Sequence, residues 1–397
     1  MPEKKKLVVA KFGGTSLQSA ECREKAVDHC RALMEGTEKL IIVVSAMGRQ
    51  GDPYATDSLL NLLSEESSTG EKDRLMACGE VISAMVMASS LRAGGLQAEA
   101  LTGWEAGIKT DGVAGNARIV SVETSLIEKA LESAQAVVIA GFQGVDRHGK
   151  LNTLGRGGAD TTAVVLGVAL KADEVLLFKT VESIYTADPE KVPFAKKLTR
   201  ISAEDLRHMA WQGAKVVHPR AAEASLSAEL PILVRSFCSG NVVTEVVPKP
   251  LEDTRYIVGV AAGPVVSGFT VGGSGKPSVF FARLFSRVAA LSVSMDMFSV
   301  WGCSAAFTVP EGDTGKVSAL IEEMECPYTV KGPCAKVSIV GAGMHGLKGV
   351  MARFCRALDS AGIDALQTVD SHATISALVS LEDRDSALAV LHREFVE

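Results

Sequence analysis

The chain has 397 residues, of which 47% are apolar, and a formal net charge of −6 at pH 7. This length exceeds what one hydrophobic core usually organises, so we expect two or three domains. The acidic balance argues against a nucleic-acid-binding surface as the main function, and no window approaches the roughly 18 uninterrupted apolar residues of a membrane span. We therefore expect a soluble protein with neither nucleic acid nor membrane as a partner.

The charged start of the chain runs directly into an apolar strand and lacks the features of a signal peptide, which predicts a cytoplasmic location. Eight cysteines are scattered along the sequence, with no Cys-X-X-Cys pair and no histidine at metal-ligand spacing. We expect reduced, mostly buried thiols and no metal held by protein side chains alone.

Short β-branched runs alternate with helical patterns in the first part of the chain. Strands are predicted over 7–12, 40–45, 136–141 and 174–178, and helices over 75–91 and 159–170. This alternation indicates an α/β domain with a largely parallel sheet, in which ligands bind at strand ends and helix starts.

Two prolines and several charged residues interrupt the pattern at 247–253, where we place the main domain boundary. Beyond it two similar segments each predict a strand, a helix, two strands and a helix. The predicted strands and first helices are 268–271, 280–290, 293–300 and 305–309, then 335–340, 351–361, 365–369 and 374–379. Two ferredoxin-like modules are the expected fold. The predicted domains are 1–247, 254–332 and 333–397, and the last strand is free to return to the first module.

The string Lys11-Phe12-Gly13-Gly14-Thr15-Ser16 follows the first predicted strand and is expected to open a helix. Two glycines let the backbone approach a phosphate, and a helix amino terminus presents unsatisfied N–H groups. Lys11 supplies a mobile cation at the strand end. A tight turn with a surface lysine explains this string alone equally well.

A second string joins Gly141-Phe142-Gln143-Gly144 to the glycine-rich loop 153–162. Backbone amides and an arginine inside such a loop suit an anionic ligand, and Arg156 is expected to grip a carboxylate in two places. Asp160, at the start of the following helix, has a helix-capping carboxylate as its alternative interpretation. A third string, 213–220, contains Lys215 as a further candidate phosphate ligand.

These strings, in register with others, resemble the aspartate kinases (aspartokinases) of the amino acid kinase superfamily. The single-function enzymes of the diaminopimelate pathway in Gram-positive bacteria are the most similar type. The resemblance covers nearly the whole chain and is carried by 11–16, 43–47, 52–60, 79–80, 101–106, 141–144, 153–162, 185–189 and 213–220. It implies a three-layer αβα, carbamate kinase-like domain followed by two regulatory ACT modules. It also implies ATP-dependent phosphorylation of the side-chain carboxylate of L-aspartate, the first step of lysine, diaminopimelate, threonine and methionine biosynthesis.

The resemblance assigns roles to individual residues. The catalytic positions are Lys11, Asp160 and Lys215; the aspartate-binding positions are Ser45, Thr56, Glu80 and Arg156; the ATP-binding positions are Lys11, Gly13, Gly14, Thr180, Tyr185, Asp188 and Lys215. Arg156 suits the α-carboxylate and Glu80 the α-ammonium, which leaves the side-chain carboxylate facing ATP. Mg²⁺ is expected to bind chiefly through the ATP phosphates. Phosphoryl transfer to an ionised carboxylate needs no general base, so His218 is expected to be structural.

Taken one at a time, these residues have simpler interpretations. Glu80 could be a solvated helix charge, Thr56 a helix cap and Ser45 a strand-end hydroxyl. Their common register with the phosphate and arginine loops favours a kinase-type site.

The chain departs from the family in the nucleotide segment, where Thr-Asp-Val-Asp-Gly is usual and residues 179–183 read Lys-Thr-Val-Glu-Ser. An expected ribose contact is missing at Thr180, and Lys179 either attracts ATP phosphates or is simply solvated. Ala159, Cys78 and Glu190 also replace usual residues. These departures keep open an amino-acid-binding regulatory subunit with a weakened nucleotide site as the alternative function. A kinase for glutamate derivatives, glutamyl compounds or nucleotides is a third hypothesis, disfavoured by Glu80 and the twin modules.

Ser294, Met295 and Asp296 match a region where family members bind an amino-acid effector, although a β-turn with a capping carboxylate explains them nearly as well. The expected effectors are meso-diaminopimelate, lysine or threonine. The strand and glycine turn over 336–344 suggest a sheet edge that packs against a partner module, which predicts a homodimer.

Overall fold

The computed structural model describes residues 5–214, 216–251, 256–344 and 346–397, which group into two compact units. The first unit comprises Met1–Ile184, Leu198–Arg207 and Lys215–Leu251; the second comprises Tyr185–Lys197, His208–Ala214 and Glu252–Glu397. Two segments that the sequence placed inside the first domain therefore belong to the second unit.

The first unit contains an eight-stranded sheet in the order β12-β14-β13-β9-β1-β2-β6-β3. Its strands are β1 (Lys5–Phe12), β2 (Thr37–Val44), β3 (Ala98–Leu101), β6 (Ala136–Ala140), β9 (Glu174–Lys179), β12 (Arg200–Ser202), β13 (Ile232–Ser236) and β14 (Val242–Val247). All neighbours are parallel except β13 and β14. The predicted, largely parallel sheet is confirmed.

Two smaller sheets contain the remaining strands of this part of the chain. A four-stranded sheet has the order β5-β4-β7-β8, with β4 (Ile108–Thr110), β5 (Ile119–Val122), β7 (Gln143–Val145) and β8 (Leu151–Thr153). A two-stranded pair, β10 (Ile184–Tyr185) and β11 (Lys197–Leu198), lies where the chain passes from one unit to the other.

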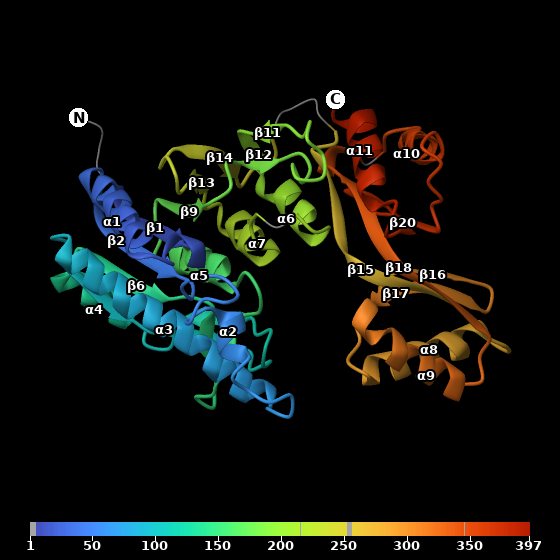
Figure 1. Ribbon diagram of the computed structural model, residues 1–397, viewed down its shortest axis with the longest axis horizontal. Coiled ribbons are helices and arrows are strands. Elements are labelled where there is room, and N and C mark those ends of the chain that lie inside the picture. Colours follow the sequence, from blue (N-terminus) through green and yellow to red (C-terminus); the bar gives the residue numbers. More distant parts are fainter. Residues whose placement is uncertain (1–4, 215, 252–255, 345) are drawn as a thin grey trace. The chain divides into compact units, whose positions relative to one another are not determined.

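Helices cover both faces of the large sheet, which makes the predicted three layers (Figure 1). The helices of this part of the chain are α1 (Ala20–Glu35), α2 (Thr56–Leu60), α3 (Thr69–Ala93), α4 (Ser125–Ser133), α5 (Gly158–Ala169), α6 (Ala203–Trp211) and α7 (Pro219–Ala228). The last residues of α6, from His208, belong to the second unit. The side chain of Ser19 caps α1, and a capping box of Ser68 and Glu71 begins α3.

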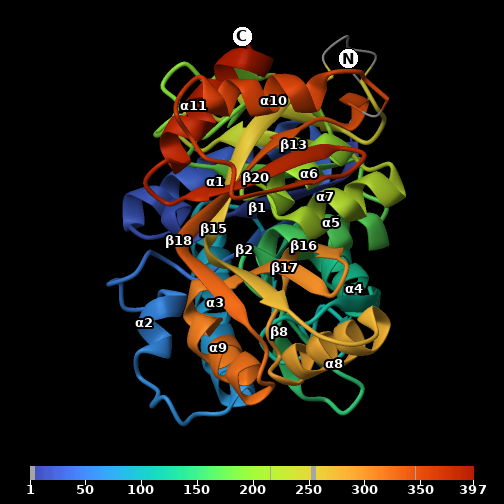
Figure 2. The ribbon, with the colours of Figure 1, turned by 90° about the vertical axis from the view of Figure 1, so that its right-hand side faces the viewer.

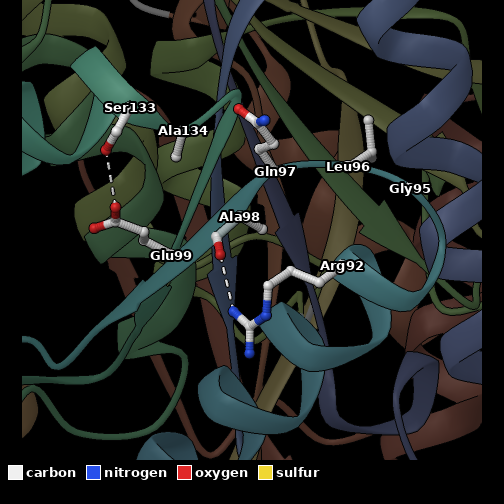
Figure 3. A pocket seen from close by; sticks show the side chains of 8 residues that line it. All are labelled: Arg92, Gly95, Leu96, Gln97, Ala98, Glu99, Ser133 and Ala134. Atoms are coloured by element: carbon white, nitrogen blue, oxygen red, sulfur yellow. Dashed lines mark hydrogen bonds between the residues drawn. The ribbon is translucent and has the colours of Figure 1, made fainter.

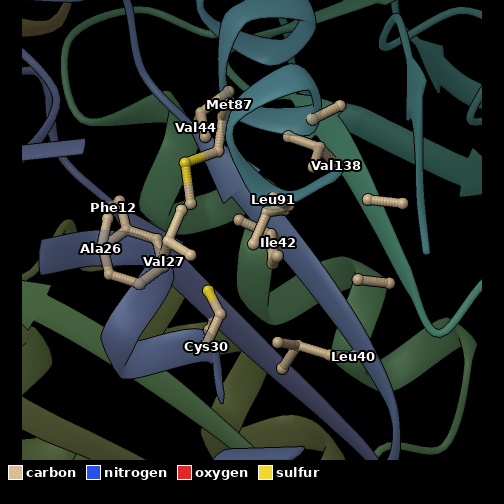
Figure 4. Packing of buried hydrophobic residues seen from close by; sticks show 14 of the residues in the cluster. Phe12, Ala26, Val27, Cys30, Leu40, Ile42, Val44, Met87, Leu91 and Val138 are labelled. Carbon is tan, nitrogen blue, oxygen red and sulfur yellow. The ribbon is translucent and has the colours of Figure 1, made fainter. Parts of the chain in front are cut away.

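Side-chain alternation along β1 sets up the chemistry at its end. Val8, Ala10 and Phe12 pack with α1 and α3 in one core cluster (Figure 4). Val9 faces the other way, toward Gly167 of α5. Because alternate residues share a face of a strand, Lys11 lies on the α5 face with Val9.

The helix α3 is long and apolar enough, by length and composition, to cross a membrane. Its second half packs Ala84, Met87 and Leu91 into the core beneath the sheet, and its first half buries the carboxyl groups of Asp73 and Glu80. These contacts make α3 a core helix of the first unit.

The second unit contains a six-stranded antiparallel sheet in the order β16-β17-β15-β18-β20-β19. Its strands are β15 (Gly259–Gly272), β16 (Asp296–Trp301), β17 (Ser304–Pro310), β18 (Tyr328–Val340), β19 (Gln367–Asp370) and β20 (Thr374–Ser380). Its helices are α8 (Pro277–Ala290), α9 (Thr314–Glu323), α10 (Val350–Asp359) and α11 (Arg384–Phe395). Short 3₁₀ turns occupy η2 (Glu311–Asp313) and η3 (Ala342–Met344).

The strands form two ferredoxin-like modules, as predicted, but the modules are nested. Figure 2 shows β15 and β18 running side by side, and each strand serves both modules. The chain ends in α11 without a last strand, and the second module takes its fourth strand from the start of β15, where Gly259 pairs with Val340. The sequence prediction found only 268–271 and missed this half, because Gly263 and Pro264 interrupt the strand pattern at a bulge.

The expected free edge at 336–344 is wrong, because β18 is a central strand hydrogen-bonded to both β15 and β20. The edges of this sheet are β16 and β19.

Contacts with the second module explain why Tyr185–Lys197 belongs to the second unit. Thr186 Oγ1 lies 2.7 Å from His392 Nε2 of α11, and both side chains are buried. The ring of Phe194 packs edge-on against His392, and Val192 joins the same core cluster.

All eight cysteines are free thiols, as expected, but the prediction that most are buried is wrong. Only Cys30 and Cys334 are buried, and Cys78, Cys238 and Cys355 are exposed. Cys78 lies on the outer face of α3, where its thiol donates to the carbonyl of Arg74, so helix position rather than apolar character decides its exposure.

Candidate active site

The candidate site lies at the carboxyl edge of the large sheet. Phe12 of β1 is in register with Val44 of β2 and Phe178 of β9, so the residues that follow these strands lie at one level. Val44 is likewise in register with Ala140 at the end of β6. This is the edge where parallel α/β sheets bind ligands.

A buried carboxylate joins two lysines at this edge. Lys11 Nζ lies 2.9 Å from Asp160 Oδ1, and Lys179 Nζ lies 2.7 Å from Asp160 Oδ2. Lys11 is 7% exposed and Asp160 is 3% exposed. Burial alone would raise the pKa of Asp160, but the two ammonium groups outweigh it and hold that pKa well below its usual range. Asp160 is therefore an anion that positions Lys11 and Lys179.

The glycine motif has a different local structure from the one predicted. Gly14–Ser16 forms a single 3₁₀ turn, and α1 begins only at Ala20, so no long helix opens at the motif. A Cβ on Gly14 would overlap the Ala46 carbonyl oxygen and lie 2.7 Å from that of Gly48, so Gly14 lets two loops pack together. A Cβ on Gly13 would lie 3.6 Å from Lys11 Nζ, so Gly13 adjoins the ammonium group.

Glu80 is a buried carboxyl group with one oxygen still unsatisfied. It is 2% exposed, and its Oε1 accepts a hydrogen bond from the Ala46 N–H at 3.1 Å. No hydrogen-bond partner for Oε2 exists among the described residues. Burial raises the pKa of Glu80 to about 8. The interpretation as a solvated helix charge is therefore wrong, and Oε2 suits a cationic ligand group.

Ser45 and Thr56 lie near Glu80 because three segments meet at Gly79. A Cβ on Gly79 would lie 2.8 Å from Ala46 Cβ, 3.0 Å from the Tyr54 carbonyl oxygen and 3.1 Å from Leu59 Cδ1. Thr56 is the first residue of α2, and the capping position is Ala55, so Thr56 is not a helix cap. Both hydroxyl side chains are half-buried and available for a ligand.

Arg156 lies exposed on the loop between β8 and α5, where Gly155 and Gly157 have φ angles of +77° and +79°. These left-handed conformations favour glycine and turn the loop sharply on both sides of the arginine. In the described part of the chain its guanidinium group has no ion pair. The fork is thus free for an anion.

Two residues that the sequence analysis did not identify hold this loop. The carboxylate of Asp73 accepts hydrogen bonds from Thr153 Oγ1 at 2.6 Å, from the Thr153 N–H at 3.2 Å and from the Gly115 N–H at 2.9 Å. Asp73 precedes Glu80 by two turns of α3, so one helix positions both Glu80 and the arginine loop. The sequence signal that could have identified Asp73 is its spacing from Glu80, which places both carboxyl groups on the buried face of the apolar helix α3.

Arg220 is the second positioning residue. Its guanidinium group donates to the carbonyls of Ala117 at 2.9 Å and Leu154 at 3.3 Å, and to Asn116 Oδ1 at 2.8 Å. These bonds tie the start of α7 to the backbone just before the arginine loop.

His218 caps α7. Its Nδ1 lies 3.2 Å from Thr161 Oγ1 and accepts from the Arg220 N–H at 3.3 Å. Burial, followed by the charge of Arg220, lowers the pKa of His218 below its usual value. A neutral imidazole engaged in this way fits a structural role.

The other predicted nucleotide residues are Thr180, Tyr185, Asp188 and Lys215. Thr180 is exposed after β9, whereas Tyr185 and Asp188 belong to the second unit. Asp188 Oδ1 accepts from the Glu190 N–H at 3.1 Å. Lys215 lies outside the described residues. The structure thus joins Lys11 and Asp160 directly but brings in Lys179 rather than Thr180.

The predicted effector residues lie in the first module of the second unit. Asp296 is already engaged, because Lys336 Nζ lies 2.7 Å from its Oδ2 and the Met297 N–H donates to its Oδ1 at 2.7 Å. Ser294 is exposed and Met295 half-buried. An effector ammonium group at Asp296 would have to compete with Lys336.

A shallow hollow of about 430 Å³ lies at the opposite, amino edge of the sheet (Figure 3). It is lined by Arg92, Gly95, Leu96, Gln97, Ala98, Glu99, Ser133 and Ala134. Arg92 donates to the Ala98 carbonyl at 2.8 Å, and Ser133 donates to Glu99 Oε1 at 3.0 Å. Arg92, Ser133 and Glu99 are thus paired and none of the predicted site residues lines the hollow, so the candidate site stays at the carboxyl edge.

Comparisons with known families match both parts of the chain. The amino acid kinase family matches residues 6–236, and an ACT domain matches residues 329–393. Aspartokinase 1 of Bacillus subtilis is 39% identical over 98% of this chain and 99% of its own length. The aspartokinase of Geobacillus stearothermophilus is 35% identical over 98% of this chain and 97% of its own length.

Solved structures show the same fold. Escherichia coli aspartokinase III, in complex with aspartate and ADP in the R-state, matches with a TM-score of 0.80 at 23% identity over 99% of this chain and 100% of that one. The aspartate kinase of Clostridium acetobutylicum matches with a TM-score of 0.78 at 20% identity over 98% of this chain and 100% of that one. Two curated relatives that align with nearly the whole sequence, and a kinase model that covers more than half of it, show that the chain belongs to the aspartokinases of the amino acid kinase family.

Proposed function

We propose that the protein transfers the terminal phosphoryl group of ATP to the side-chain carboxylate of L-aspartate, giving ADP and 4-phospho-L-aspartate. The observation that carries this proposal is that two features occur at the same edge of the sheet: a buried, unsatisfied Glu80 oxygen, and Lys11 and Lys179 around Asp160. The ammonium group of an amino acid with a second carboxylate fits the Glu80 oxygen, and phosphates fit the two lysines.

Each described residue has a defined task in this reaction. Arg156 binds the α-carboxylate, Glu80 accepts from the α-ammonium group, and the hydroxyls of Ser45 and Thr56 orient the amino acid. A side-chain oxygen then attacks the γ-phosphorus of ATP while the bond from that phosphorus to the bridging oxygen breaks. The ammonium group of Lys11 stabilises the negative charge that develops on the phosphoryl oxygens, and Lys215 is proposed to stabilise the same charge.

Magnesium is proposed to enter with ATP. Among the described residues no three His, Cys, Asp or Glu side chains gather as a metal site, and both oxygens of Asp160 already face lysines. These observations support binding through the ATP phosphates, where Mg²⁺ supplies charge neutralisation.

The direct test is aspartate-dependent ADP release from magnesium-ATP by the purified protein. Activity is expected without any effector, and glutamate is expected to be a poor substitute for aspartate. A folded preparation that binds aspartate but shows no turnover and no ATP binding at millimolar concentration would instead support the regulatory-subunit alternative.

Aspartate binding is expected to release a proton near pH 7. The raised pKa of Glu80, about 8, keeps the free carboxyl group mostly protonated there, whereas the bound ammonium group favours the carboxylate. Affinity for aspartate is therefore expected to rise between pH 6 and pH 8. Titration calorimetry in two buffers with different ionisation enthalpies measures the proton, and Glu80→Gln is expected to abolish its release.

The folding stability of the ligand-free protein is expected to change with pH in the direction opposite to the affinity for aspartate. Its folded state holds the Glu80 proton more tightly than the unfolded chain, so its stability is expected to fall as pH rises from 4.5 to about 8. Aspartate binding without proton release in the wild-type protein would contradict the assignment of Glu80.

The tandem ACT modules are proposed to bind a feedback effector near Ser294, Met295 and Asp296. One aspartokinase III structure from E. coli contains lysine as well as aspartate, in the T-state. Meso-diaminopimelate, lysine and threonine are the candidates, and the activity assay with each compound at saturating concentration tests them.

We propose a homodimer that uses the edge strand β16. Its exposed side chains include Phe298, Val300 and Trp301, the last of which is 52% exposed. An apolar edge strand is a surface that favours pairing with a second copy. Trp301→Lys is expected to shift sedimentation toward the monomer, whereas Val279→Lys, at an exposed site on α8, is the matched control. A wild-type monomer at micromolar concentration would contradict the proposal.

The cytoplasmic location and the domain limits at 247, 254 and 332 stay predictions.

A further inference from the structure

Lys179 occupies the end of β9, at the position where the sequence departs from the usual threonine. Leu176 and Phe178 of the same strand pack in the core, and the ring of Phe178 stacks on that of Phe12 with centroids 4.6 Å apart. Alternation then turns Lys179 to the opposite face, which carries α5 and Asp160. The possibility that Lys179 is simply solvated is wrong, because its side chain is only 17% exposed.

The three charged groups leave an excess of positive charge in a buried place. Lys11 and Lys179 face one oxygen each of the single carboxylate, Asp160. An ammonium group has three N–H donors, and for each lysine the described residues provide only this one acceptor. Both lysines therefore retain donors for an anionic ligand.

We propose that Lys179 is a phosphate-binding residue for ATP, acting beside Lys11 with Asp160 between them. The inference rests on the proposed kinase function, because that function names the anion. In this proposal Lys179 contacts an ATP phosphate, whereas the ribose contact expected at the position of Thr180 is missing.

The electrostatics agree with this assignment. Burial, together with the charge of Lys11, lowers the pKa of Lys179 although Asp160 opposes the shift. Phosphate oxygens would relieve the repulsion between the two ammonium groups. A residue that only neutralised Asp160 would be redundant, since Lys11 already pairs with that carboxylate.

The test is calorimetric titration of Lys179→Met with magnesium-ATP, ADP and AMP. A lost charge-assisted phosphate contact is expected to weaken ATP binding by about 10-fold to 100-fold. AMP binding is expected to change little, because AMP lacks the distal phosphates, and the KM for aspartate is expected to stay unchanged. Lys179→Arg is expected to restore most of the ATP affinity.

Lys6→Met is the matched control, since Lys6 is exposed on β1 and its loss changes the net charge equally. Equal weakening of ATP and AMP, or no weakening of either, would overturn the proposal. If Lys179→Met does not fold, the ATP and AMP titrations are made with Lys179→Thr, which introduces the residue usual at this position.

These titrations need no turnover, so the two proposals fail separately. A wild-type protein that binds ATP but releases no ADP with aspartate refutes the kinase function. Only the comparison of ATP with AMP decides the role of Lys179.

Discussion

Replacement of Arg156 by glutamine is expected to raise the KM for aspartate by about 100-fold, because a bidentate, charge-assisted contact to the α-carboxylate is lost. The kcat is expected to fall as well, since the amino acid would no longer be held in line with ATP. The KM for ATP is expected to stay nearly constant. Steady-state kinetics with one substrate varied at a time measures all three quantities.

The exposed position of Arg156 makes this variant informative. The guanidinium group has no ion pair in the described chain, so its removal leaves no buried charge unpaired and folding is expected to be normal. Arg147→Gln is the control, because Arg147 is exposed on the β7–β8 turn and, among the residues that the structure describes, donates a hydrogen bond only to the neighbouring His148. Unchanged turnover of Arg156→Gln at limiting aspartate would remove the basis for the proposed substrate orientation.

Replacement of Lys11 by methionine is expected to lower kcat by about 10²-fold to 10⁴-fold, as for other groups that stabilise transition-state charge. Methionine keeps the length and apolar stem of the side chain but removes its charge. Substrate KM values are expected to change less, because the contact strengthens as the phosphoryl group moves. Rapid-quench measurement of the first turnover separates this chemical step from product release.

A low kcat of Lys11→Met could also result from a damaged fold, and thermal unfolding of the variant tests this separately. Asp160 retains Lys179 as a partner in Lys11→Met, so the loss of thermal stability is expected to be modest. A variant with normal kcat would show that Lys11 is only a counterion of Asp160.

The parallel sheet and the Lys11 motif could be predicted because their signals are local. β-branched runs mark β1, β2, β6 and β9, and two glycines follow β1, whose last two residues are Lys11 and Phe12. The position of Glu80 in the site came from the family resemblance, whereas its burial and unsatisfied oxygen came only from the structure.

The pairing of Lys179 with Asp160 could not be predicted, because it depends on strand order rather than on spacing. β9 must lie beside β1, and both strands must present the same face to α5, before the two side chains meet. Asp73 was missed for a similar reason, since its partners Thr153 and Gly115 are distant in sequence. The assignment of Tyr185 and Asp188 to the second unit depends on the packing of their segment against α11.

The nested arrangement of the two modules constrains how the carboxy-terminal part can be divided. A cut between residues 332 and 333 would sever β18 and separate the first half of β15, from Gly259 to Val266, from its partners between Cys334 and Val340. The second module would then lack its fourth strand and the first half of β15 its neighbour, so the modules are expected to unfold as one cooperative block and to resist exchange with single modules from other chains.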